Sequence, residues 1–229
     1  MNVVHLCDCM EFMKGIPDKH YELAIVDPPY GIGFGEFNRT NKDANGNRFK
    51  SNKYKNGEWD ISIPDDKYFE ELIRISKNQI VWGGNYFPYL WQKGCKGFIF
   101  WYKQNPVNNF SDGELAYTSF DKVAKCFNYQ YYGNINSEKD RIHPTQKPVA
   151  LYKWLLKNYA KPNDRIFDSH VGSGSIRIAC HDMGFDFTGC EIDKDYWQAQ
   201  EERYKTHINQ QDLFSGKELQ ESIMQGVLV

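Results

Sequence analysis

The residues best suited to chemistry in this chain are four in a row, Asp27-Pro28-Pro29-Tyr30. Asp27 offers a carboxylate acceptor, and the carbonyl of Pro28 offers a second. Pro29 has no N–H and biases Pro28 towards an extended backbone, so the direction of that carbonyl is set in advance. Two such acceptors could bind both N–H groups of an exocyclic amine and turn its lone pair towards an electrophile. Tyr30 adds a flat face on which a base can stack. The four residues are typical of amine methylation, although a plain strand-to-turn junction would also explain them.

An apolar run, Leu23-Ala24-Ile25-Val26, leads directly into this turn. Continuous β-branched and aliphatic runs of this length are typical of parallel strands buried on both faces. Ligands of open α/β sheets bind just beyond the carboxyl ends of such strands. The run therefore places Asp27 where a ligand would be expected.

A second turn begins at Asp168 and contains Gly172, Ser173 and Gly174. The two glycines let the backbone approach a ligand closely, and the N-terminus of the helix predicted to follow offers free N–H groups. Seventeen residues after Gly174 the next predicted strand ends at Glu191, which could bind both hydroxyls of a ribose. Asp168 would attract a cationic ammonium group.

The ligand indicated by this turn is a nucleoside without a pyrophosphate. The third glycine of a dinucleotide fingerprint is absent, because Ile176 and Arg177 stand there, and this disfavours an NAD-dependent oxidoreductase. S-adenosylmethionine has a ribose, an ammonium and a sulfonium, and no phosphate. Upstream, the segment His143–Pro148 predicts a wall of the same site, with Lys147 or Thr145 near the methionine carboxylate. A proline-bounded loop that caps a helix is the alternative.

Length and composition indicate a single folded domain that does not span a membrane. The 229 residues are 41% hydrophobic and 16% aromatic, which excludes a disordered chain. No apolar run approaches the roughly 18 residues of a membrane span, and residues 1–4 do not resemble a signal peptide. The six cysteines are expected to be reduced thiols, and no metal site is indicated.

The net charge of −2 hides a basic segment between residues 38 and 57. This segment has one acidic residue, Asp43, and is too polar for a core element, so we expect a long surface loop. Phosphate contact would explain its charge, as would an ordinary solvated loop. Its six basic residues are Arg39, Lys42, Arg48, Lys50, Lys53 and Lys55.

Short apolar runs alternate with amphipathic stretches, which predicts an α/β fold with a mostly parallel sheet and helices on both faces. The expected strands are residues 3–6, 23–26, 79–82, 97–101, 115–119, 165–167 and 187–190. The expected helices are residues 10–15, 65–77, 148–159, 175–183 and 196–207, with a further one around 217–224.

Taken in this order, the signatures closely resemble DNA amino-methyltransferases of the permuted, β-type arrangement, which have a Rossmann-like fold. Asp27–Tyr30 matches the catalytic tetrapeptide of that family, His143–Pro148 its pre-cofactor segment, and Gly172–Gly174 its cofactor loop. The resemblance implies one domain over residues 1–229. Its catalytic half would span about 1–101, a short target-recognition segment about 102–142, and a cofactor-binding half about 143–208.

The resemblance also implies the site residues. Gly189-Cys190-Glu191 and Tyr196 resemble the ribose-binding strand and its following helix, and Asp8 resembles the acidic residue that flanks the cofactor adenine. The catalytic residues would be Asp27, Pro28, Pro29 and Tyr30. S-adenosylmethionine would contact Asp8, Asp27, Lys147, Asp168, Gly172, Ser173, Gly174 and Glu191. The DNA-binding residues would be Arg39, Arg48, Lys50, Lys53 and Lys55.

One departure from the family pattern stands before the cofactor glycines, where Asp168-Ser169-His170 replaces Asp-Pro-Phe. We expect His170 to be a polar variant at a packing position rather than a catalytic group. The middle segment holds eight aromatic residues, of which some must belong to the core.

The resemblance implies a site-specific enzyme that methylates N6 of adenine in double-stranded DNA. The N4-cytosine enzymes of the same family, and a non-catalytic nucleic-acid-binding subunit on the same fold, are the alternatives. We expect a cytoplasmic, nucleoid-associated protein encoded by a bacterium or phage and taking part in DNA modification. A second copy of the chain and a cognate restriction enzyme are partners that the sequence leaves open.

Overall fold

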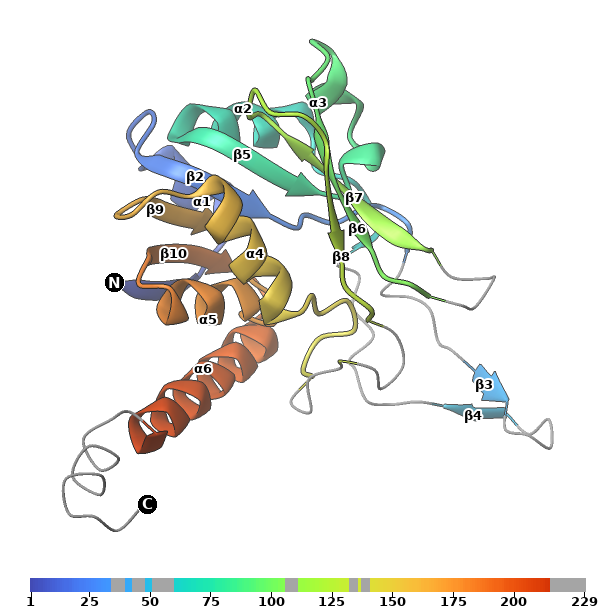
Figure 1. The fold of residues 1–229 in the computed structure, drawn as a ribbon, viewed down its shortest axis with the longest axis vertical. Coiled ribbons are helices and arrows are strands. Elements are labelled where there is room, and N and C mark those ends of the chain that lie inside the picture. Colours follow the sequence, from blue (N-terminus) through green and yellow to red (C-terminus); the bar gives the residue numbers. More distant parts are fainter. Residues whose placement is uncertain are drawn as a thin grey trace, which may run out of the picture.

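A computed structural model describes residues 1–33, 40–42, 48–50, 60–105, 111–131, 136 and 141–214. Its centre is an eight-stranded sheet in the order β1-β10-β9-β2-β5-β7-β6-β8 (Figure 1). Within this eight-stranded sheet only β7 runs antiparallel to its neighbours, so the predicted, mostly parallel sheet is confirmed. In chain order the strands are β1 Asn2–Leu6, β2 Tyr21–Val26, β5 Ser76–Trp82, β6 Phe98–Tyr102, β7 Gly113–Thr118, β8 Lys125–Asn128, β9 Arg165–Asp168 and β10 Asp186–Glu191.

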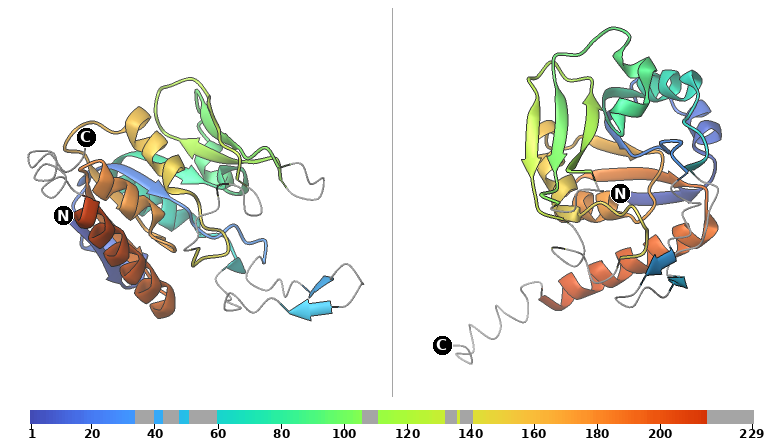
Figure 2. Two further views of the ribbon diagram at one scale, coloured as in Figure 1. Left: turned by 60° about the horizontal axis from the view of Figure 1, so that its bottom comes forward. Right: turned by 90° about the vertical axis from the view of Figure 1, so that its right-hand side faces the viewer.

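Helices cover both faces of this sheet, as predicted (Figures 1 and 2). One layer consists of α1, α2 and α3, and the other of α4 and α5 with the first part of α6. The bounds are α1 Cys9–Lys14, α2 Asp66–Ile75, α3 Pro88–Trp91, α4 Val149–Tyr159, α5 Ser175–Asp182 and α6 Lys194–Phe214. A short 3₁₀ helix, η3 Gly84–Tyr86, precedes α3.

Strand β2 shows why its apolar run is continuous. Leu23 and Ile25 pack in the core under α4 and α5, while Ala24 and Val26 pack in the core under α1 and α2. Successive side chains of a strand point to opposite faces, so a strand covered on both sides needs apolar residues at every position. The burial of β2 fixes the direction in which the chain leaves it at Asp27.

The carboxyl ends of four neighbouring parallel strands bring four acidic residues to one edge of the sheet. Asp8 follows β1, Glu191 ends β10, Asp168 ends β9, and Asp27 follows β2. Strands β2 and β9 are direct neighbours although about 140 residues separate them in the chain. This crossover joins the two turns that the sequence singled out.

Several elements were not predicted. Strand β8, η3 and α3 lie in stretches without clear periodicity, and α6 runs on to Phe214. The expected surface loop contains two short antiparallel strands, β3 Thr40–Lys42 and β4 Arg48–Lys50, which stand away from the main sheet (Figure 2). The helix expected around residues 217–224 lies outside the described residues.

Candidate active site

The turn after β2 is held by two carboxylates. The hydroxyl of Tyr30 donates a 2.5 Å hydrogen bond to Oδ1 of Asp27. The backbone N–H groups of Tyr30 and Gly31 donate to Oδ1 of Asp60 at 2.7 and 2.9 Å. Asp60 is buried, and Pro28 is buried at the start of the turn. The tetrapeptide is therefore fixed at both ends before any ligand arrives.

The ring of Tyr30 contacts a glycine and a second tyrosine. A Cβ atom on Gly83, which has φ +69°, would come within 2.2 Å of the Tyr30 ring. The ring of Tyr86 stacks on Tyr30 with centroids 5.0 Å apart and an interplanar angle of 15°. Tyr86 belongs to η3 and is 37% exposed. An aromatic surface therefore lies at the predicted catalytic turn, and it is open to solvent at Tyr86.

Lys147 reaches this turn from the segment before α4. Its ammonium forms an ion pair with Oδ2 of Asp27 and lies 3.3 Å from the hydroxyl of Tyr30. The same nitrogen lies 3.3 Å from Oε2 of Glu114, on β7. Lys103, just after β6, pairs with the other oxygen of Glu114. Two lysines and two carboxylates thus form one electrically balanced cluster under the turn.

Burial and charge act in opposite directions on this cluster. Burial alone would raise the pKa of Glu114, but the charges of Lys147 and Lys103 outweigh it and lower that pKa to about 2. Burial would likewise lower the pKa of Lys147, and the charges of Asp27 and Glu114 raise it above its ordinary value. Both groups are therefore ionised at neutral pH. Burial, reinforced by the Asp27 charge, raises the pKa of Tyr30, so its hydroxyl stays a donor.

Glu191 is oriented by backbone donors at the end of β10. Its Oε2 accepts a 2.8 Å hydrogen bond from the N–H of Gly172, and its Oε1 accepts a 2.9 Å bond from the N–H of Asp193. A carboxylate has about four acceptor positions, so two backbone bonds leave room for two ligand hydroxyls. These two free acceptor positions fit the two hydroxyl donors of a ribose.

The glycine turn keeps the space around Glu191 open. Gly172 has φ +52°, and a Cβ atom there would meet only the His143 ring, at 3.9 Å or more. Gly174 has φ +73°, and a Cβ atom there would lie 3.2 Å from Gln200. Left-handed backbone of this kind strongly favours glycine. Ser173 is buried between them, where its carbonyl accepts from Arg203 at 2.7 Å.

Asp168 is buried to 1% exposure at the end of β9. Its Oδ1 accepts a 2.9 Å hydrogen bond from the N–H of His170. Burial, followed by the charges of Asp27 and Glu191, raises the pKa of Asp168 to about 8. The charge of Lys147 lowers this pKa but does not outweigh burial, so Asp168 would gain from a cationic ligand, which would restore its ionised form. This chemistry fits an ammonium group.

The unusual His170 is part of a hydrogen-bonded chain. Its Nδ1 lies 2.8 Å from Oγ of Ser169, which in turn lies 2.6 Å from the hydroxyl of Tyr68 on α2. Burial lowers the pKa of His170 to about 4, so the ring is neutral. Ser169 and His170 thus have a polar partner in the Tyr68 hydroxyl. The expectation that His170 has a packing role rather than a catalytic one stays a prediction.

The remaining expected site residues divide into two groups. Asp8 caps α1, where its Oδ1 accepts from the N–H groups of Met10 and Glu11 at 2.8 and 3.1 Å. Arg48 and Lys50 stand on β4, whereas Arg39, Lys53 and Lys55 lie outside the described residues. The expected contacts of these basic residues with DNA stay predictions.

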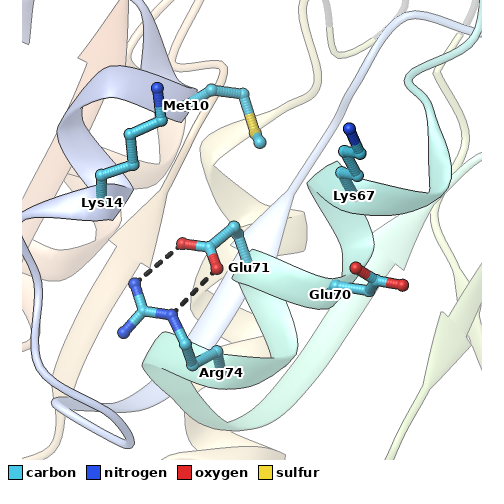
Figure 3. Close-up of a pocket in the computed structure, with 6 residues that line it drawn as sticks. All are labelled: Met10, Lys14, Lys67, Glu70, Glu71 and Arg74. Carbon is cyan, nitrogen blue, oxygen red and sulfur yellow. Dashed lines mark hydrogen bonds and ion pairs between the residues drawn. The ribbon is translucent and has the colours of Figure 1, made fainter.

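A hollow of about 450 Å³ lies elsewhere, between α1 and α2 (Figure 3). Arg74 there pairs with Glu71 at 2.8 Å and with Asp18 at 2.9 Å, so its charge is already compensated. In the ranges given above, no group of three or more metal-ligating side chains occurs, and no helix is long and apolar enough to cross a membrane. All six cysteines are free, as predicted.

Known proteins resemble this chain in sequence. A family model described as DNA methylase, N6_N4_Mtase, matches residues 98–202. The type II methyltransferase M.HinfI of Haemophilus influenzae is 26% identical over 253 aligned residues, covering 90% of this chain and 68% of that protein. M.HpaI of Haemophilus parainfluenzae is 23% identical, covering 88% and 74%. Over these spans the chain is similar to DNA methylases.

Solved structures confirm the predicted fold. The M1.HpyAVI–SAM complex is 23% identical and matches 89% of this chain and 100% of its own, with a TM-score of 0.55. The cytosine-N4-specific PvuII DNA methyltransferase is 11% identical and matches 90% of each chain, with a TM-score of 0.57. The eight-stranded α/β sheet is thus the fold of DNA methyltransferases.

Four residues of the site were not singled out from the sequence. Glu114 and Lys103 reach the site because β6 and β7 pair antiparallel, and no local sequence pattern predicts this pairing. Asp60 follows the basic segment, and Tyr86 lies in η3. The Gly83-Gly84 pair after β5 is the one sequence signal that could have pointed to a close approach, since Gly83 packs on Tyr30.

Proposed function

We propose that this chain transfers the methyl group of S-adenosylmethionine to the exocyclic N6 amine of adenine in double-stranded DNA. The observation that carries the proposal is the position of Asp27 and Asp168 at the carboxyl ends of adjacent strands. A site for an aromatic amine and a site for a cationic nucleoside would therefore share one edge of the sheet.

The cofactor would be held by the C-terminal half. Glu191 would bind the ribose hydroxyls, Asp168 the ammonium group, and Asp8 the neighbourhood of the adenine. The turn from Gly172 to Gly174 would pass close beside it, with Ser173 buried at its centre. When bound, S-adenosylmethionine supplies an electrophilic methyl group. No metal ion is needed for such a transfer.

The catalytic turn would position the target. The amine lies inside the duplex, so the base must be flipped out at a cost of a few kcal/mol. Stacking on Tyr30, worth about 1–3 kcal/mol, would offset part of this cost. Asp27 and the carbonyl of Pro28 would accept the two N–H groups, with Pro29 fixing the direction of that carbonyl. Most of the catalysis is then positioning, and Asp27 is also placed to take the proton that the methylated amine loses.

The basic segment would contact DNA phosphates through Arg39, Arg48, Lys50, Lys53 and Lys55, and residues 102–142 would contribute to target recognition. The second candidate is N4 methylation of cytosine, which presents the same amine geometry; the PvuII enzyme of this fold is specific for it. The aspartate at the head of the tetrapeptide favours adenine.

Modified-base sequencing of DNA from cells that express the chain tests this proposal. The expected result is N6-methyladenine at one short sequence. N4-methylcytosine would support the second candidate instead. Unmodified DNA from cells that contain folded protein would refute both.

A further inference from the structure

Both oxygens of Asp27 already accept a hydrogen bond in this structure, although the proposed reaction requires one of them to accept from the target amine. Its Oδ1 accepts from the hydroxyl of Tyr30 at 2.5 Å, and its Oδ2 is taken by the ammonium of Lys147. The Asp27 side chain is only 19% exposed, so these two hydrogen bonds are not readily replaced by bonds to water. The target amine therefore competes with Tyr30 and Lys147 for the Asp27 carboxylate when the base enters.

A second acceptor for Lys147 lies within reach. Oε2 of Glu114 is buried and already forms an ion pair with the Lys147 ammonium at 3.3 Å, a longer contact than that of the same ammonium with Asp27. A charge-assisted hydrogen bond is strongest at about 2.7–2.9 Å, so this contact would strengthen if the ammonium moved towards Glu114. Glu114 therefore offers Lys147 a second carboxylate partner beside Asp27.

The two ends of this contact differ in stiffness. Glu114 stands on β7, which pairs with β6 on one side and β5 on the other, and Lys103 holds its other oxygen. Lys147 carries its ammonium on a four-carbon stem from a loop that precedes α4. The lysine is thus the part that can move, and the glutamate is the fixed acceptor.

We propose that Lys147 changes partners during target binding, and that Glu114 is the positioning residue that takes its ammonium when the target amine takes Oδ2 of Asp27. This inference rests on the proposed function. The exchange moves no proton and breaks no covalent bond, and Lys147 stays paired with a carboxylate throughout. Without Glu114 the ammonium would stay on Asp27 and compete with the base.

The charge on Lys147 depends on groups from every element around it. The carboxylates of Asp27 and Glu114 raise its pKa against the effect of burial. Loss of the Glu114 charge should therefore lower the pKa of Lys147. The titratable and charged groups that face this cluster are Asp27, Tyr30, Lys103, Glu114, His143, Tyr152 and Asp168.

The test is Glu114→Gln, which keeps the size of the side chain and removes its charge. Single-turnover methyl transfer to unmodified genomic DNA should fall at least tenfold at pH 7, while the Kd values for S-adenosylmethionine and DNA stay within about twofold of the parent. Glu114→Asp keeps the charge and should recover most of the rate. The matched control is Glu11→Gln, because Glu11 also pairs with a lysine but is exposed on α1.

The pH profile separates partner exchange from a merely structural role. As pH rises above 7, the rate of Glu114→Gln should recover towards that of the parent, since loss of the proton from Lys147 releases Asp27. Thermal unfolding of each variant verifies that it is folded over this range.

Three results would overturn the inference: an unchanged rate in Glu114→Gln, a loss by the same factor at every pH, or a loss that accompanies weaker cofactor or DNA binding. A parent protein that transfers no methyl group to DNA would instead refute the proposed function, and the inference would fall with it.

Discussion

Lys147 and Asp27 lie 120 residues apart in the chain and form an ion pair at the carboxyl end of β2. The Lys147 side chain is 3% exposed, so its charge depends on its carboxylate partners. Removing one partner from a buried pair typically costs 3–5 kcal/mol when the other is left alone. Here Glu114 remains beside Lys147, so a substitution of Asp27 still leaves the buried ammonium with a carboxylate partner.

Tyr30 acts through both its ring and its hydroxyl, and two substitutions separate these roles. Tyr30→Phe keeps the ring that stacks on Tyr86 and removes the hydrogen bond to Asp27. Tyr30→Ala also removes the stacking surface, worth about 1–3 kcal/mol, or a further 5- to 150-fold in rate. We expect the alanine variant to be clearly slower than the phenylalanine variant in single-turnover methylation. Equal rates would show that the base does not stack on Tyr30.

Gly174→Val should abolish cofactor binding, because valine adopts φ +73° poorly and its Cβ would lie 3.2 Å from Gln200. Gly184→Val is the matched control, since Gly184 has φ +75° and open space around it. Both variants should lose stability, but only Gly174→Val should lose S-adenosylmethionine in calorimetric titration. Parallel losses of affinity in the two would mean that backbone strain alone explains the effect.

Glu191→Ala should weaken cofactor binding by about 1.5–3 kcal/mol, the range for hydrogen bonds to a charged group. The substitution also leaves the N–H groups of Gly172 and Asp193 without their present acceptor, which loosens the turn. The same calorimetric titration measures this change. An affinity equal to that of the parent would remove Glu191 from the cofactor site.

Cofactor binding should release a proton from Asp168. Its pKa of about 8 means that the free protein holds a proton there at neutral pH, which an unfolded chain would have lost. Stability from this group therefore falls as pH rises from about 4 to 8, whereas binding of an ammonium group improves. Titrations at pH 7 in two buffers of different ionisation enthalpy should show release of close to one proton. Asp168→Asn should show none, and an unchanged release in that variant would contradict the assignment.

The basic segment should set the salt dependence of DNA binding. Replacing Arg48, Lys50, Lys53 and Lys55 with glutamine should flatten the slope of log affinity against log salt by up to about 3–4 units, at about 0.9 per phosphate contact. All DNA sequences should weaken together, because phosphate contacts do not specify bases. The control replaces four lysines at the opposite edge of the sheet, namely Lys14, Lys77, Lys157 and Lys161. An unchanged slope in the first variant would exclude the segment from the interface.

The parts of the site that sequence could predict are those that follow buried strands. Short strand-like runs identify β2, β9 and β10, and each run ends at or just before an acidic residue, so Asp27, Asp168 and Glu191 could be placed on one edge. Glu114 could not be placed there, because it lies on an alternating strand whose position depends on pairing with β5 and β6. The sequence predicts Lys147 or Thr145 near the cofactor carboxylate, and this stays a prediction. The ion pairs of Lys147 with Asp27 and Glu114 had no signal in the sequence.

Methyl transfer by purified Asp27→Ala is the most direct test of the account. The parent protein, unmodified DNA and S-adenosylmethionine with a labelled methyl group should yield labelled N6-methyladenine, identified by nucleoside mass spectrometry. Asp27→Ala should bind DNA and remain folded, with Lys147 paired to Glu114, and should yield no labelled base. Methylation by Asp27→Ala at near the parent rate would contradict the central role of this carboxylate.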